Sequence, residues 1–382
     1  MDRRTLLLRG GASLVGLATF GCASGPNRVS RVRPARRLTP VDATWARVIR
    51  TTVGLRPYRR SGFVLRAERL GEKVLIHNFG HGGSGMSLSW GTGQMAADLA
   101  MGGEVRTVAV VGCGVVGLTT ARQLQRRGFN VTVYAKDVPP NTTSNMSLAS
   151  WTPTSGLVAA ERRTAEWDSQ FREAARIAYG ELQLLVGRGY GVSWIEGYSL
   201  HQRPPGARVA VDPLLPPDLS AESTVFGPGQ HSFPTPYATM RPSMRIEPSI
   251  YLDRLVSDVR ESGAEIVIRA FDSREHLSTL PDPIIVNCTG LGARDLVGDS
   301  ELTPLKGQLT LLMPQEGVDY STFGAASPLA GGFVHMSPRS DGIALGGTSV
   351  EGDWSLEPDP EARRRIVDAH IDLFGRMHPV KP

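Results

Sequence analysis

The pattern of hydrophobic and polar positions predicts alternating strands and helices through the middle of the chain. Residues 107–111 and 130–134 are short apolar runs with the length of buried strands, and residues 115–127 between them have the periodicity of an amphipathic helix. This order predicts the opening of a parallel βαβ unit. The same patterns predict helices over 86–99, 164–187, 248–263 and 360–374, a strand over 265–269, and a buried strand ending in a turn over 284–290.

Two segments lack this periodicity. Residues 23–42 are rich in proline, arginine and serine and are typical of a tether, whereas residues 203–242 are rich in proline and glycine and are expected to form loops and a sheet edge. The 382 residues are 41% hydrophobic and 21% charged, as in a soluble globular protein. This length suits one large domain or two interlocked ones.

The net charge of +5 does not by itself indicate an anionic partner. Much of the excess lies in the arginines between Arg28 and Arg37, outside the expected core. A solvated tether and a basic segment lying on a membrane surface are the two interpretations of this stretch. The sequence shows no nucleic-acid-binding motif, so we expect no nucleic-acid partner.

Residues 1–22 resemble a twin-arginine export signal, because Arg3 and Arg4 precede a weakly apolar run that extends to Phe20. The run is too short and too broken by glycine for a membrane-spanning helix. Cys22 offers an alternative as a lipid anchor, although the Thr19-Phe20 pair before it departs from the usual lipoprotein pattern. We therefore expect export to the periplasm or another extracytoplasmic space.

A glycine-rich turn at residues 112–117 follows the first strand and opens the helix after it. Glycines at the turn allow a pyrophosphate to approach the backbone at the N-terminus of a helix, and a polar residue after the second strand can meet the ribose. A tight turn without a nucleotide is the alternative. The cofactor-binding residues expected in this unit are Gly112, Gly114, Val115, Val116, Gly117, Lys136 and Asp137.

A second glycine-rich segment precedes this turn in the sequence. Gly80, Gly82, Gly83 and Gly85 fall within six residues and come just before the helix expected at 86–99. Such a segment lets a flat ligand approach the main-chain N–H groups, and the N-terminus of the helix would face it.

The segment 76–91 resembles the IHNYGHGGxG segment of the D-amino-acid oxidase family, and residues 53–60 resemble the GxRPxR segment of the same family. In that family both lie near the C-terminus, whereas here both precede the glycine turn at 112–117. The chain also ends soon after the helix at 360–374, where the family would continue into these segments. The sequence from about Trp45 onward therefore resembles a circularly permuted member of the family.

This resemblance implies a doubly wound, Rossmann-like FAD-binding domain interleaved with an antiparallel-sheet substrate domain. After the signal at 1–22 and the tether at 23–42, residues 43–382 would form this permuted oxidoreductase. Its FAD-binding parts would be about 72–160 and 264–300, and its substrate-domain parts about 43–71, 161–263 and 301–382.

The resemblance also distinguishes FAD from NAD, which the glycine turn alone does not. Residues 141–151 resemble the family's threonine-rich segment and the GLW sequence after it, except that Ala149 and Ser150 replace glycine and leucine. Residues 287–290 resemble its NCTG turn, which could otherwise be any turn at the end of a strand. The cofactor contacts that follow by resemblance are Thr142, Thr143, Ser144, Ala149, Ser150, Trp151, Phe271, Thr289, Gly290, Gly82, Gly83, Ser84, Gly85, Met86 and Ser87.

By the same resemblance, Arg56 would hold the substrate carboxylate, for which a planar, permanently charged guanidinium is well suited. His335 stands where the family usually has a tyrosine that also binds the carboxylate; it could donate a similar hydrogen bond and carry charge below about pH 6.5, or it could be a sheet histidine without substrate contact. The Gly83 carbonyl would face the amine. His77 and His81 are expected to order the backbone rather than bind a metal.

The function implied is the FAD-dependent oxidation of D-amino acids by molecular oxygen to 2-oxo acids, ammonia and hydrogen peroxide. One alternative keeps the fold but changes the reaction to a flavin amine dehydrogenase or to an oxidase of glycine or D-aspartate. Another is a flavin-binding envelope protein without turnover, suggested by the departures at Ala149, Ser150 and His335. The glycine-rich segment at 80–85 disfavours an NAD-dependent dehydrogenase.

Overall fold

The structure, a computed structural model, describes residues 36–148, 150–206, 212–324 and 332–378. The predicted export signal at 1–22 with Cys22, most of the predicted tether, and Ala149 lie outside these described residues. The described residues form one compact unit that contains two sheets.

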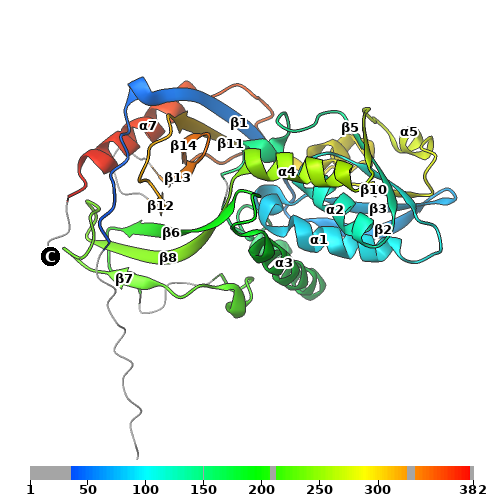
Figure 1. Cartoon of the computed structure of the whole chain (residues 1–382), viewed down its shortest axis with the longest axis horizontal. Helices are drawn as coiled ribbons and strands as arrows, with labels where there is room; N and C mark the ends of the chain where they lie inside the picture. The colour runs from blue at the N-terminus through cyan, green and yellow to red at the C-terminus, as the bar shows by residue number, and fades with distance from the viewer. Residues whose placement is uncertain (1–35, 149, 207–211, 325–331, 379–382) are drawn as a thin grey trace, which may run out of the picture. The chain divides into compact units, whose positions relative to one another are not determined.

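The six-stranded sheet has a parallel core, as the βαβ pattern predicts (Figure 1). Its order is β2 (Val64–Leu70), β3 (Lys73–Phe79), β10 (Ile284–Asn287), β4 (Thr107–Val111), β5 (Asn130–Ala135) and β9 (Glu265–Ile268). Only the edge strand β2 is antiparallel to its neighbour among these described strands. Parallel strands of this kind are covered on both faces, so their sequences are continuous apolar runs without alternating polar residues.

Four helices gather around the side of this sheet that bears the larger core. They are α1 (Gly85–Ala100), α2 (Val115–Arg126), α3 (Ala165–Leu185) and α4 (Pro248–Glu261). Helix α1 is buried between α2 and α3, and a side chain at Gly91 would come within 2.0 Å of the Ala174 carbonyl oxygen, so glycine is needed for this close packing. The Trp90 indole N–H donates to the Tyr251 hydroxyl across 2.6 Å and joins α1 to α4.

The nine-stranded sheet is mostly antiparallel, with one parallel pair between β12 and β6. Its order is β1 (Val48–Tyr58), β11 (Thr303–Leu312), β14 (Gly342–Gly346), β13 (His335–Arg339), β12 (Tyr320–Phe323), β6 (Val192–His201), β8 (Tyr237–Ile246) and β7 (Thr224–Phe226), and β15 (Val350–Glu351) pairs with β11. The segment expected to be loop and sheet edge contains the edge strand β7 and the start of β8.

The last helix, α7 (Pro360–Gly375), covers one face of the nine-stranded sheet. The Asp359 carboxylate accepts hydrogen bonds from the N–H groups of Glu361 and Ala362 and so caps the helix at its start. Leu373 and Phe374 are buried in a core shared with side chains of β6, β8 and β11–β14. The opposite face of the nine-stranded sheet lines a cavity, through residues such as Phe323 and His335. Two short helices, α5 (Arg274–Ser278) and α6 (Ala293–Leu296), lie in the connections around β10.

The division between the two domains differs from the expected one in residues 43–71. Strand β2 was expected in the substrate domain, but it pairs with β3 in the six-stranded sheet. The two strands are joined by a tight turn in which Gly71 has a φ of 60°, and such a short connection makes its strands antiparallel neighbours. Helices α3 and α4, also expected with the substrate domain, pack against α1 and α2.

Candidate cofactor and substrate site

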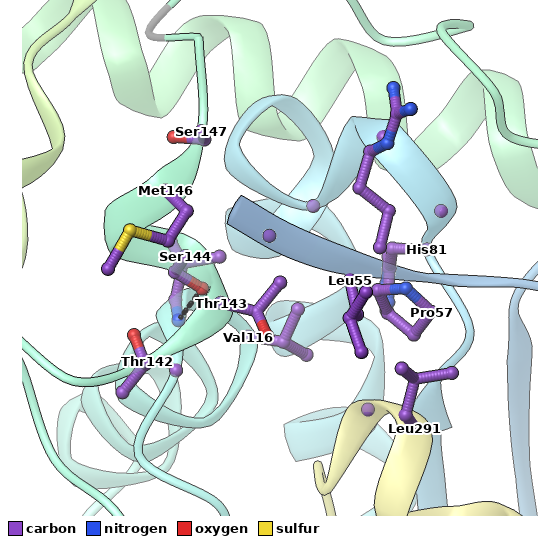
Figure 2. A pocket seen from close by; sticks show the side chains of 18 of the residues that line it. Leu55, Pro57, His81, Val116, Thr142, Thr143, Ser144, Met146, Ser147 and Leu291 are labelled. Atoms are coloured by element: carbon purple, nitrogen blue, oxygen red, sulfur yellow. Dashed lines mark hydrogen bonds between the residues drawn. The ribbon is translucent and has the colours of Figure 1, made fainter. Parts of the chain in front are cut away.

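A cavity of about 750 Å³ lies where the carboxyl ends of β3, β4 and β10 meet the nine-stranded sheet. Ligands bind at this edge of an open parallel sheet, because the strands end there and the following helices begin there. Figure 2 shows Thr142, Thr143 and Ser144 on one side of the pocket and Leu55, Pro57 and Leu291 on the other.

The glycine turn forms one end of the cavity and permits close backbone packing. Gly112 has a φ of 119°, and a Cβ there would lie 2.4 Å from the Cys288 carbonyl oxygen. A Cβ on Gly117 would lie 1.9 Å from the Gly112 carbonyl oxygen, so Gly117 holds the first turn of α2 against the glycine turn and does not itself line the cavity. The predicted residues Gly114, Val115 and Val116 do line it.

The threonine-rich segment packs against this turn. Thr143–Met146 form a short 3-10 helix, and the Ser144 hydroxyl accepts a hydrogen bond of 3.0 Å from the Val115 N–H, as drawn in Figure 2. The Val115 N–H is one of the donors at the start of α2 that have no partner within the helix. Ser144, which also lines the cavity, accepts its hydrogen bond. The other predicted residues of this end that line the cavity are Lys136, Asp137, Thr142, Thr143, Phe271, Thr289 and Gly290.

The second glycine-rich segment closes the cavity from the other side. A Cβ on Gly82 would lie 1.8 Å from the Gly156 carbonyl oxygen, and a Cβ on Gly83 would lie 2.5 Å from that of Ser155. Gly82, Gly83, Gly85 and Met86 all line the cavity. The neighbouring residue His81 is completely buried, its Nε2 lies 3.0 Å from the Thr92 hydroxyl, and burial lowers its pKa to about 3. This imidazole is therefore neutral and orders the segment.

Several predicted cofactor residues lie behind the cavity wall. The Ser84 hydroxyl donates to the carbonyl groups of Thr152 and Ser155, and the Ser87 hydroxyl accepts from the Thr152 N–H at 2.9 Å. These bonds fasten the segment 150–155 to the start of α1. The remaining members of this group are Ser150, which is buried, and Trp151, whose ring packs against Tyr179.

Arg56 is a half-buried cation at the other end of the cavity. Its Nε donates to the Leu305 carbonyl at 2.8 Å, and its Nη2 donates to the Ser349 hydroxyl at 3.1 Å. It makes no ion pair with a carboxylate of the described residues. Burial lowers its pKa from the ordinary value, because the guanidinium loses water around its charge. The neutral partners hold the group in place and leave its charge for an anion.

His335 begins β13 and lines the cavity between Phe323 and Phe333, whose ring centres lie 6.4 and 5.8 Å from its own. Its Nδ1 is buried and has no hydrogen-bond partner among the described residues. Burial lowers its pKa to about 3, with smaller contributions from the nearby His370 and Arg56. The sequence allowed His335 to carry charge below about pH 6.5; with this lowered pKa its imidazole is neutral at that pH in the protein without substrate.

Three apolar residues that line the cavity, on or next to strands of the nine-stranded sheet, were not predicted from the sequence. Leu309 on β11, Phe323 on β12 and Phe333 before β13 form an apolar wall around His335. They carry no motif of their own. The one signal is that Phe333 lies two positions before His335 and so falls on the same side of an extended chain.

The sequence matches the model of the family described as FAD dependent oxidoreductase (DAO) over residues 7–99 and 107–381. It is 31% identical to the D-amino-acid oxidase of Rubrobacter xylanophilus over 287 residues, which cover 72% of this chain and 79% of that protein. It is 28% identical to the D-aspartate oxidase of Homo sapiens over 279 residues, 72% of this chain and 78% of that protein. The structure is similar to that of glycine oxidase from Geobacillus kaustophilus, with a TM-score of 0.52, 15% identity, and 72% of this chain and 81% of that chain covered, which is a likeness of fold.

Proposed function

The chain belongs to the FAD dependent oxidoreductase (DAO) family, and from this premise we propose that it is an FAD-dependent oxidase of D-amino acids. The reaction converts a D-amino acid, oxygen and water into a 2-oxo acid, ammonia and hydrogen peroxide. The observation that carries the proposal is Arg56, a half-buried, partly desolvated guanidinium that faces the cavity and has no carboxylate partner among the described residues.

The cavity fits FAD at the end that would hold its nucleotide. Gly112 and Gly117 stand where any side chain would meet a main-chain carbonyl, so the start of α2 can lie close to a pyrophosphate. The hydroxyls of Thr142, Thr143 and Ser144 supply neutral hydrogen-bonding groups beside it. Phe271 and Asp137 line the far end, where the adenosine would lie.

When bound, FAD supplies the two-electron chemistry by accepting a hydride from the substrate α-carbon and returning the electrons to oxygen. The protein supplies position and charge. Arg56 would bind the α-carboxylate in a site where burial strengthens a charge-assisted pair. The neutral His335 has a ring nitrogen without a partner and would add a hydrogen bond to the same carboxylate.

The substrate amine must lose its proton before oxidation, and among the described residues no carboxylate side chain lines the cavity at this end to take it. Asp137 is the one carboxylate among the described residues that line the cavity, and it lies at the nucleotide end. The proton would therefore leave to solvent, and the neutral amine would face the main-chain carbonyl of Gly83. Activity should rise with pH as the amine of the bound substrate deprotonates.

Anaerobic mixing of the purified holoenzyme with a panel of D-amino acids tests the proposal. We expect loss of the visible absorbance of oxidised flavin with D-amino acids, no change with the L-enantiomers, and hydrogen peroxide once air is admitted. Bleaching without peroxide in air would indicate a dehydrogenase instead. Bound FAD that no D-amino acid bleaches would contradict the proposal and favour a flavin-binding protein without turnover.

We further propose that the protein works outside the cytoplasm after export by the twin-arginine route, on the strength of Arg3, Arg4 and the apolar run after them. Among the residues that the structure describes, no helix has the length and apolar character to cross a membrane. The double variant Arg3→Lys, Arg4→Lys should keep the protein in the cytoplasm, and a Cys22→Ala variant should release it from membranes only if Cys22 carries a lipid. Normal export of the double variant would contradict the proposal.

A further inference from the structure

Two buried hydroxyls without partners lie on the sheet face that lines the substrate end of the cavity, two positions along the strands from the cavity-lining residues Phe323 and His335. Alternation along the strands places Ser321 on the same face as Phe323, and Ser337 on the same face as His335. Both serines are completely buried, and neither hydroxyl has a hydrogen-bond partner among the described residues. Because buried polar groups are nearly always satisfied, these two hydroxyls indicate that a polar group belongs beside them.

An arginine stands in the same row of the sheet. Strand pairing sets Ser321 of β12 opposite Gly197 of β6, and Gly197 opposite Arg241 of β8. A Cβ on Gly197 would lie 3.2 Å from the Ser243 Cβ and 3.4 Å from the Ser321 hydroxyl, so Gly197 places no side chain of its own between Ser321 and Arg241. The main chains at Ser321 and Arg241 are two strand spacings apart, about 10 Å, most of which an extended arginine side chain can span.

Arg241 carries a charge that nothing in the described part of the chain neutralises. Its Nε is buried and has no partner there, and it makes no ion pair with a described carboxylate. The segments 207–211 and 325–331, which the structure leaves undescribed, contain no aspartate or glutamate. The other arginines on this face differ, because Arg245 pairs with Glu247 and Arg339 pairs with Asp341.

From this arrangement we propose that Arg241, with the hydroxyls of Ser321 and Ser337, forms a subsite for a carboxylate on the substrate side chain. The preferred substrates are then acidic D-amino acids, D-aspartate or D-glutamate, with Arg56 on the α-carboxylate and Arg241 on the second one. The inference rests on the proposed function. A guanidinium and two hydroxyl donors suit an anion, since each can donate to carboxylate oxygens.

The kinetic test compares each acidic substrate with its neutral amide, which has nearly the same shape. The wild-type holoenzyme should have a higher kcat/KM for D-aspartate than for D-asparagine, or for D-glutamate than for D-glutamine. Arg241→Met keeps an apolar stem without the charge, and it should lower that ratio at least tenfold. Arg241→Lys should restore part of the ratio. Arg188→Met, at an exposed position, removes the same charge from the protein and should leave the ratio unchanged.

A binding measurement keeps the test independent of turnover. Succinate and butyrate can be titrated into each holoenzyme, with the flavin absorbance as the readout and FAD content and thermal melting as checks of folding. We expect wild type to bind succinate more tightly than butyrate, and this preference to be lost in Arg241→Met. If D-alanine and other neutral D-amino acids are oxidised but neither acidic substrates nor succinate are preferred, the subsite is wrong and the oxidase function stands. If no D-amino acid is oxidised while succinate is still preferred through Arg241, the function is wrong and the anion subsite stands.

Discussion

The indole N–H of Trp45 donates a hydrogen bond of 2.9 Å to the Asp368 carboxylate, which joins the beginning of the described chain to its last helix. The Arg363 guanidinium lies over the same indole ring at 5.5 Å. Figure 1 shows strand β1, which follows Trp45, beside helix α7. The sequence predicts this proximity, because a circularly permuted chain must bring together the two ends that are continuous in the unpermuted order.

The permutation can be tested by restoring the other order. We expect a chain that begins at Val105 and runs to residue 378, then through a short Gly/Ser linker to residues 36–104, to bind stoichiometric FAD. Its matched control is the chain 36–378 in its natural order. The new ends would fall between α1 and β4, in an exposed connection where new termini are tolerated. Loss of flavin from the reordered chain alone would argue against the permutation.

Local patterns predicted the helices and strands around the glycine turn to within about two residues, because each of these elements has a strong periodicity and a marked start or end. Strands β12 to β14 were harder to predict from the sequence, because they are short and are defined by their pairing with one another. Phe323 of β12, for example, pairs with His335 of β13. The neutral state of His335 depends on burial, which the sequence does not show. Arg241 fell within a segment read as loop and sheet edge, and only its lack of a partner in the structure gives it significance.

Replacement of Arg56 by alanine should weaken substrate binding and leave FAD bound. The lost interaction is a charge-assisted pair with a carboxylate, worth roughly 1.5 to 3 kcal/mol, so kcat/KM should drop at least tenfold. The matched control is Arg60→Ala, because Arg60 is exposed and pairs with the exposed Glu161. Steady-state kinetics with a visible spectrum of each variant measure both properties. Equal kcat/KM for Arg56→Ala and wild type would remove Arg56 from the site.

Replacement of Gly117 by alanine should cost the protein its cofactor. The new Cβ would lie 1.9 Å from the Gly112 carbonyl oxygen, so the first turn of α2 must move away from the glycine turn. Such overpacking costs about 1–3 kcal/mol of stability, and it displaces the N–H groups expected to face the pyrophosphate. Gly180→Ala in α3 is the control, since nothing lies within 4 Å of its Cβ. Flavin content after gel filtration and thermal melting report the two effects; full flavin content in Gly117→Ala would count against this cradle.

The holoenzyme should lose stability as the pH falls below neutral, because three buried imidazoles are neutral in the folded state. Burial lowers the pKa of His81 and His335 to about 3 and that of His370 to about 4, against an ordinary value of 6.5. Between these values the unfolded chain binds more protons than the folded one, so the free energy of unfolding decreases as pH decreases and is fully recovered above about pH 6.5.

Each such imidazole contributes a slope of at most about 1.4 kcal/mol per pH unit, so the three together give at most about 4 kcal/mol per unit. Urea unfolding of the FAD-saturated protein at several pH values from 5 to 7 measures the slope, in a window above the titration of ordinary carboxylates. His370→Leu should reduce the slope by at most about 1.4 kcal/mol per pH unit, whereas His378→Gln, at an exposed position, should leave it unchanged. A free energy of unfolding that stays constant over this window would show that these imidazoles become protonated without unfolding, and that the histidine beside Arg56 is not held neutral by burial.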